Sequence, residues 1–223
     1  FHTVLVVFPQ GLKPTYRAHF SDGTYVDCSD DHIWSILDKN GDIINVTTLD
    51  MILMRTNNEK VEVPQLTAAV RFHIPQYKVE DCFTEGDNGM LTVQSSLLTA
   101  PISLRVDICM NTLKKLGIIN LNNKSIQLTN RFVNNFKLLC DIYRSIGCIV
   151  NEISSDTVDI FVPEWLNPYD KGTDNYYLIQ EWGDMRHKYV HSIEQIPDKE
   201  CQCIYVDNPS HLFLTNKFTP THN

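Results

Sequence analysis

The chain has no excess of basic residues and no long apolar run. Its 19 Lys and Arg stand against 27 Asp and Glu, which gives a formal net charge of −8. Because nucleic-acid binding needs cations that neutralise phosphates, this balance argues against general DNA or RNA binding. No apolar stretch approaches the roughly 18 residues of a membrane-spanning helix, and residues 1–9 lack the charged flank and cleavage site of a signal peptide. We expect a soluble, cytoplasmic protein without a membrane partner.

The cysteines exclude a further class of fold. There are seven, an odd number at irregular spacing, which is not the pattern of a disulfide framework and fits a reducing compartment. Apolar residues, in contrast, are plentiful, since 43% of the chain is hydrophobic and 10% is aromatic. A chain of 223 residues with this composition can bury a sizeable core, as one large domain or two small ones.

Residues 1–63 have the pattern of short strands joined by tight turns. Val4–Phe8 is an apolar run, followed by the turn-forming Pro9–Gly11. Ser21–Gly23 and Asp38–Gly41 are hairpin signals. We therefore expect a β-rich first segment.

The middle of the chain changes to a helical period. Strand-like pieces at Ser125–Leu128 and Thr157–Val162 make this region α/β, and strand-like alternation is predicted again from Tyr176 to Gln195. The helix endings at Gly117 and Gly147 suggest two related helix units. Helices are predicted over 48–54 with Thr47 or Thr48 as N-cap, over 102–116 with Gly117 as C-cap, and over 132–146 with Asn130 as N-cap and Gly147 closing it.

The C-terminal segment carries groups that can cleave a peptide bond. In Cys201–Asn223, two histidines and two cysteines precede a terminal asparagine. The side-chain amide nitrogen of Asn223 can attack its own backbone carbonyl, close a succinimide and expel the peptide that follows. Histidines accelerate such a step near neutral pH by activating the nitrogen and by protonating the leaving amine. His222 and His211 are the candidates for these roles.

Two segments resemble the splicing blocks of inteins. Cys201–Asn223 looks like the two C-terminal blocks, and Ser21–His32 is similar to the block with a Thr-x-x-His core, with Ser29 in place of the threonine. The resemblance implies a mainly β Hint-type horseshoe formed by the two ends of the chain, with an α/β domain inserted between them. The implied boundaries are 1–68 for the N-terminal part of the splicing domain, 69–185 for the insert and 186–223 for the C-terminal part.

The insert resembles a degenerate LAGLIDADG homing endonuclease. Tyr143–Gly147 is similar to a helix end common in that family, but the motif that names the family is missing. Residues 70–190 contain twelve Lys and Arg against fourteen Asp and Glu, which argues against a basic saddle for DNA. Glu85 and Asp87 are candidate Mg²⁺ ligands, but a sequence such as Glu-Gly-Asp-Asn-Gly at 85–89 more often forms a solvated turn. We expect no metal and no cofactor.

The intein resemblance also implies a nucleophile that this chain does not show at its start. An intein begins with cysteine or serine, whereas Phe1 cannot attack the preceding carbonyl. We expect a split intein whose N-terminal piece is a separate chain. A truncated contiguous intein is one alternative. The other alternative is the class of inteins that use an internal cysteine as nucleophile. Trp34 and Cys203 match the positions at which that class has a tryptophan and a cysteine. The implied partners are the N-terminal fragment and the flanking exteins, in a microbial or phage-infected host cell.

The resemblance assigns roles to His32, Ser29 and Cys203, and for His32 and Ser29 there is also a structural alternative. His32 would protonate the amide at the N-terminal junction, or be a satisfied core histidine. Ser29 would hold that junction, or cap the turn that follows it. Cys203 would couple the two junction reactions or act as the internal nucleophile. Cys28, Cys109 and Cys140 are expected to be buried in the core.

Autocatalytic protein splicing by thioester exchange and asparagine cyclisation is therefore the expected function. The alternatives are a site-specific homing endonuclease and a catalytically silent structural or binding module. The predicted catalytic residues are Asn223, His222, His211, His32, Cys203 and Ser29.

Overall fold

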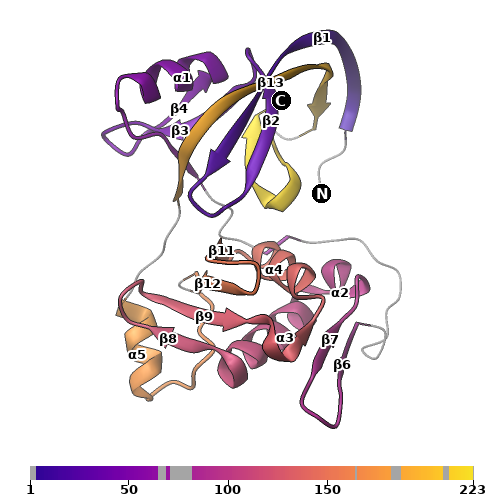
Figure 1. Ribbon diagram of the computed structural model, residues 1–223, viewed down its shortest axis with the longest axis vertical. Coiled ribbons are helices and arrows are strands. Elements are labelled where there is room, and N and C mark those ends of the chain that lie inside the picture. The colour runs from indigo at the N-terminus through magenta and orange to yellow at the C-terminus, as the bar shows by residue number, and fades with distance from the viewer. Residues whose placement is uncertain are drawn as a thin grey trace. The chain divides into compact units, whose positions relative to one another are not determined.

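The chain forms a mainly β structure with two compact units. The computed structural model describes residues 4–64, 69–70, 82–163, 165–181, 187–207 and 211–222. Unit 1 is formed by both ends of the chain, Phe1–Gln65 and His187–Asn223, and unit 2 by Leu66–Arg186 (Figure 1). Segments far apart in sequence therefore share unit 1.

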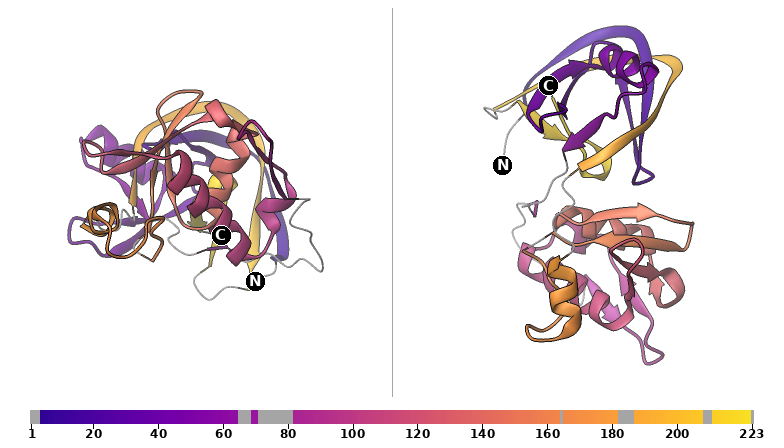
Figure 2. Two further views of the ribbon diagram at one scale, coloured as in Figure 1. Left: turned by 90° about the horizontal axis from the view of Figure 1, so that it is seen from below. Right: turned by 90° about the vertical axis from the view of Figure 1, so that its left-hand side faces the viewer.

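A six-stranded sheet dominates unit 1 and is built around two long antiparallel strands, β1 and β13. Both curve along their length, as Figure 2 shows. The order is β2-β1-β13-β5-β3-β4, with strands β1 (Val4–Phe20), β2 (Tyr25–Ser29), β3 (Ile33–Leu37), β4 (Ile43–Thr47), β5 (Glu62–Pro64) and β13 (His187–Val206).

The two predicted hairpins in this sheet are confirmed, but the prediction of a short first strand is wrong. Gly23 (φ 79°) and Gly41 (φ 86°) turn the chain between β1 and β2 and between β3 and β4. β1 does not stop at Phe8, because a register shift between Pro9 and Gly11 lets its pairing with β13 continue. Gly11 at φ 71° supplies the backbone conformation that this bulge needs.

Helix α1 (Thr48–Thr56) begins where the sequence predicts. Thr47 is its N-cap, and it forms a reciprocal capping box with Asp50. The helix contributes Met51 to a core that also contains Trp34 and Ile36, all fully buried.

The C-terminal residues form a small hairpin, coloured yellow in Figures 1 and 2. β14 (Leu212–Leu214) pairs with β15 (Pro220–His222), and a 3-10 turn, Asn216–Phe218, joins them. Lys217 and Phe218 both have positive φ, 63° and 60°. Two consecutive side chains in the left-handed region are costly, so contacts around this turn must hold it.

Unit 2 contains a two-fold repetition of a helix followed by a β-hairpin. α3 (Ile102–Leu116) is followed by β8 and β9, and α4 (Phe136–Ser145) by β11 and β12. The hairpins join into one sheet of order β11-β12-β9-β8. The remaining bounds are β6 (Phe83–Glu85), β7 (Leu91–Val93), α2 (Ser96–Thr99), β8 (Ile118–Asn120), β9 (Ser125–Thr129), β10 (Val133–Asn134), β11 (Ile149–Glu152), β12 (Thr157–Phe161) and α5 (Asp174–Glu181).

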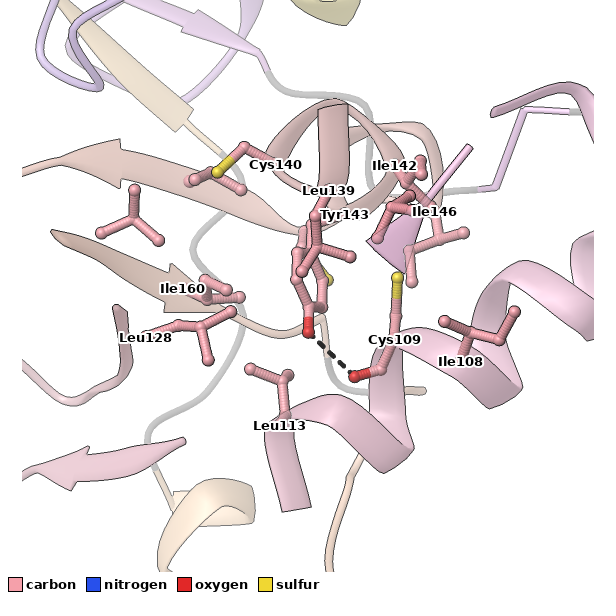
Figure 3. Close-up of a cluster of buried hydrophobic side chains, with 14 of the residues drawn as sticks. Ile108, Cys109, Leu113, Leu128, Leu139, Cys140, Ile142, Tyr143, Ile146 and Ile160 are labelled. Atoms are coloured by element: carbon pink, nitrogen blue, oxygen red, sulfur yellow. Dashed lines mark hydrogen bonds between the residues drawn. The ribbon is translucent and has the colours of Figure 1, made fainter. Parts of the chain in front are cut away.

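The core of unit 2 lies between these helices and this sheet. Tyr143 of α4 is fully buried, and its hydroxyl donates to the carbonyl of Cys109 on α3 over 2.9 Å (Figure 3). Cys109 and Cys140 are buried, as predicted. None of the described helices is long and apolar enough to cross a membrane.

Two local predictions in unit 2 are wrong. Asn130 does not cap α4, because residues after it form a 3-10 turn and then β10, which pairs in parallel with β7. The cap is Asn135, with φ 59°. Residues Tyr176–Glu181 are helical in α5 rather than extended, and the Thr173 hydroxyl accepts from the Tyr176 amide at the helix start. In the rest of that predicted stretch, His187–Gln195 is confirmed as extended, because these residues lie in β13.

Glycine is required at the ends of α3 and α4 for two different physical reasons, lack of space at Gly117 and backbone conformation at Gly147. Gly147 has φ 91°, and the amides of Gly147 and Cys148 bond back to carbonyls of α4 as in an αL cap. Gly117 has the ordinary φ of −74°. A Cβ on Gly117 would lie 2.5 Å from both the Ile126 Cγ2 atom and the Leu113 carbonyl oxygen.

Gly117→Ala is therefore expected to destabilise unit 2 by overpacking, by about 1–3 kcal/mol. Urea unfolding of the variant and wild type measures this difference. Asn122→Ala, in the exposed turn between β8 and β9, is the control and should change stability by less than about 0.5 kcal/mol. Equal stability of Gly117→Ala and wild type would show that the close approach does not constrain this position.

Candidate functional site

The C-terminal hairpin brings two of the predicted catalytic histidines together. Leu212 on β14 pairs with His222 on β15, and His211 immediately precedes β14. The rings of His211 and His222 have centroids 5.8 Å apart and are tilted by 30°. Tyr205, at the end of β13, packs against the His211 ring at 5.9 Å. The hairpin pairing thus makes neighbours of residues that are eleven positions apart.

The third histidine reaches this hairpin from the N-terminal part of the chain. The Nε2 atom of His32 lies 2.5 Å from the Thr221 hydroxyl oxygen on β15. Trp34 packs edge-on against the His32 ring, with centroids 5.1 Å apart. The Thr48 amide donates to the His32 carbonyl over 3.0 Å, which fixes the backbone at the start of β3. His32, Thr221, His222 and His211 therefore form one continuous cluster.

Burial controls the charge of His32. Loss of hydration lowers its pKa to about 4, and the neighbouring His222 acts in the same direction, while Asp31 opposes the shift. At neutral pH the His32 ring is therefore uncharged. One of its ring nitrogens is then a donor and the other an acceptor, so it can exchange a proton through a hydrogen bond.

Asn223, the predicted cyclising residue, lies outside the described residues. The described site includes its neighbours Thr221 and His222. These two lie in β15, against His32 and His211 respectively.

Ser29 and Trp34 make contacts that also explain them structurally. The Ser29 hydroxyl donates to the Asp31 carboxylate over 2.7 Å, in the turn that it was alternatively expected to cap. Asp31 in turn pairs with Lys13 at 2.5 Å. The Trp34 indole is fully buried and donates to the Thr48 hydroxyl over 3.1 Å.

Cys203, the predicted coupling residue or nucleophile, and Cys28, the predicted core residue, lie in different environments. Cys203 is exposed on β13, opposite Phe8 of β1. Its thiol is therefore open to solvent and is not enclosed by the histidine cluster. Cys28 is buried, as predicted, and burial raises its pKa to about 11, which disfavours the nucleophilic thiolate.

The structure adds a residue that sequence reasoning missed. Lys188 is 1% exposed, and its ammonium donates to the hydroxyls of Thr219 (2.6 Å) and Thr24 (3.0 Å) and to the Asp22 carboxylate (3.4 Å). No clear sequence signal pointed to this burial, because the alternate positions that follow Lys188 do not form an apolar strand face. These positions are Val190, Ser192 and Glu194.

Glu85 and Asp87, the predicted alternative metal ligands, lie at the β6–β7 hairpin. Glu85 is bonded to the Lys115 ammonium, and Gly89 at φ 75° completes the turn. Within the described residues, no three His, Cys, Asp or Glu side chains gather in a group that could hold a metal ion.

The depressed pKa of His32 predicts a pH dependence of stability. An unfolded histidine titrates near 6.5, so between about pH 6.5 and 4 the unfolded state binds more protons than the folded state. The contribution is fully present above pH 6.5 and is lost as the pH falls toward 4, by on the order of 3 kcal/mol. Urea unfolding from pH 7.5 to 4.5 should show this slope, and His32→Leu should flatten it. NMR titration of a His32 ring near pH 6.5 in the folded protein would contradict the prediction.

Comparison with known proteins does not give a family for this chain. No family model matches it, and no curated protein matches it.

Proposed function

We propose that this chain is an intein-type protein-splicing domain whose own part of the reaction is cleavage at Asn223. The single observation that carries this proposal is the contact between His32 and Thr221, which are 189 positions apart in sequence. Through Thr221 and His222, that contact joins the Thr-x-x-His-like segment to the C-terminal segment. These are the two segments whose resemblance to splicing blocks predicts a shared site, and unit 1 is proposed to be a Hint-type horseshoe.

The proposed chemistry is an intramolecular acyl transfer. The Asn223 side-chain nitrogen bonds to the Asn223 backbone carbonyl carbon and gives up a proton. The bond from that carbon to the next residue's nitrogen breaks, and the leaving amine takes up a proton. The products are a C-terminal succinimide and a free amino group on the downstream extein. His211 would accept the first proton, and His222 would assist departure of the amine.

His32 has a different proposed role. Its uncharged ring, hydrogen-bonded at Thr221, is suited to donate a proton to the amide nitrogen that leaves at the N-terminal splice junction during the first acyl shift. That shift needs a cysteine or serine nucleophile, which the proposed N-terminal piece supplies. Splicing in trans would then ligate the two exteins.

Cleavage is tested by appending to Asn223 a short tag that begins with serine. Wild-type protein should release the tag and leave a C-terminal succinimide. Mass spectrometry detects it, because this product is one water lighter than the chain that ends in Asn223 with a free carboxyl group. Asn223→Ala should abolish release, and His222→Ala or His211→Ala should slow it by about 10²–10⁴-fold, the usual contribution of a general acid or base.

His19→Ala is the matched control for tag release. This histidine belongs to the same unit but bonds to Glu194 on the surface of the sheet, so release should proceed at the wild-type rate. An intact tag on folded wild-type protein, with the N-terminal piece present, would refute the proposed function.

The outer half of β1 is the proposed docking place of the N-terminal piece. Val4–Phe8 are five consecutive apolar residues, each between 43% and 54% exposed. Among the described residues, this half of β1 pairs with β13 alone, since β2 joins β1 only at Thr15–His19. A two-stranded ribbon with exposed apolar side chains is marginal by itself. Its unpaired backbone edge suits the addition of a further strand.

A candidate N-terminal piece, taken from a neighbouring reading frame, should therefore slow amide exchange at Val4–Lys13 when it binds. Val6→Glu should weaken binding by about tenfold, because it charges a side chain that would become buried. Leu53→Glu makes the same kind of change on the exposed face of α1 and should leave binding unchanged. Equal effects of the two substitutions would exclude this ribbon as the docking place.

Unit 2 is proposed to be a remnant of a LAGLIDADG-type endonuclease without cleavage activity. Its repeated helix-hairpin order supports the relationship. Two of its few basic side chains are neutralised locally, because Lys114 pairs with Asp170 at 2.6 Å and Lys115 pairs with Glu85. Such neutralisation does not favour binding to a DNA backbone.

A further inference from the structure

The buried ammonium of Lys188 connects the C-terminal hairpin, which carries part of the histidine cluster, to the β1–β2 turn. It extends from β13, and its three oxygen partners come from two places. Asp22 and Thr24 belong to the β1–β2 turn, whereas Thr219 belongs to the segment that leads into β15. The ammonium therefore joins the first hairpin of the chain to the last.

The bond to Thr219 acts on the C-terminal hairpin. Thr219 is fully buried and follows the two residues with positive φ, Lys217 and Phe218. A backbone in this conformation is retained only when its surroundings fix it. Thr219 is also two residues before Thr221, so the hydrogen bond from Lys188 holds the residue that immediately precedes β15.

A second path leads from Lys188 to His32. The ammonium lies 4.3 Å from the centroid of the Phe20 ring, a cation–π contact. Phe20 packs edge-on against Trp34 at 5.9 Å, and Trp34 packs against His32 at 5.1 Å. The same lysine thus supports both partners of the His32–Thr221 contact.

Stability alone does not explain why a charged side chain is buried at position 188. A buried ion pair stabilises a fold no better than apolar side chains of similar volume, and its best-attested use is to specify one arrangement. The Asp22 carboxylate is held for this pairing, since it accepts from the Thr24 amide (3.1 Å) and hydroxyl (2.5 Å). Orientation of the two hairpins is an arrangement that such a pair can specify.

We propose that Lys188 is a positioning residue that locks the C-terminal hairpin against the β1–β2 turn and thereby holds Thr221 on His32. Its importance for cleavage at Asn223 rests on the proposed function. Its effect on the His32–Thr221 contact does not, and the two are measured separately.

The test compares Thr219→Val with Thr219→Ser in the full chain. Valine keeps the volume and removes the acceptor, whereas serine restores the hydroxyl. In Thr219→Val the hairpin should loosen and water should reach His32, so the His32 pKa measured by NMR should rise from about 4 toward its ordinary value. Release of a C-terminal tag should slow by about tenfold or more, the value of a hydrogen bond to a charged group. Thr219→Ser should restore both.

Thr24→Val is the matched control, because it removes another acceptor of the same ammonium without touching the C-terminal segment. It should leave the His32 pKa unchanged. The double variant Lys188→Met/Asp22→Asn removes both charges together, avoids an unpaired buried carboxylate, and should reproduce the Thr219→Val shift. An unshifted His32 pKa in folded Thr219→Val, or equal shifts in Thr219→Val and Thr24→Val, would overturn the positioning role. A folded wild type that keeps its tag while the pKa shifts as expected would refute cleavage alone.

Discussion

The antiparallel pairing of β1 with β13 is the constraint on which unit 1 depends. It runs from Val4 opposite Val206 to Phe20 opposite Val190, and so joins the two segments of unit 1 along the whole length of β1. Lys188 lies just beyond this pairing, beside the β1–β2 turn, and Tyr205 lies at its other end, against His211. The histidine cluster follows from this arrangement. β3 and β15 carry its members, but the long pair decides that these elements belong to one unit.

Within this frame, burial determines what the site can do. A histidine near solvent would be partly charged at neutral pH, whereas enclosure by Trp34 and the C-terminal hairpin keeps His32 uncharged. The same enclosure makes the site dependent on packing, since any loosening of β15 admits water. The charge state of His32 is therefore coupled to the stability of the hairpin, because the packing that orients the His32 ring also lowers its pKa. The buried Lys188–Asp22 pair adds hydrogen bonds of fixed geometry to a core that is otherwise held mainly by apolar contacts.

The sequence was sufficient for features set by local chemistry. The Thr47 cap, the glycine turns at Gly23 and Gly41, and the αL ending at Gly147 were all predicted, because each depends on a few adjacent residues. Features set by distant partners were not. Asn130 is a residue type that often caps helices, but the residues after it pair with β7 as strand β10, so α4 begins only at Phe136. The unbroken β1, the burial of Lys188 and the contact of Thr221 with His32 each require a partner from the other end of the chain.

The register between the first and last strands also orders events in time. β1 leaves the ribosome early, whereas its partner β13 appears only after the whole of unit 2 has been made. Unit 2 has its own core, and its described strands pair only with strands of the same unit, so it can fold first. Until β13 emerges, Val4–Phe8 of β1 have no strand to pair with, and His32 lacks its contact with the C-terminal hairpin. The histidine cluster can therefore form only after β15 has been synthesised.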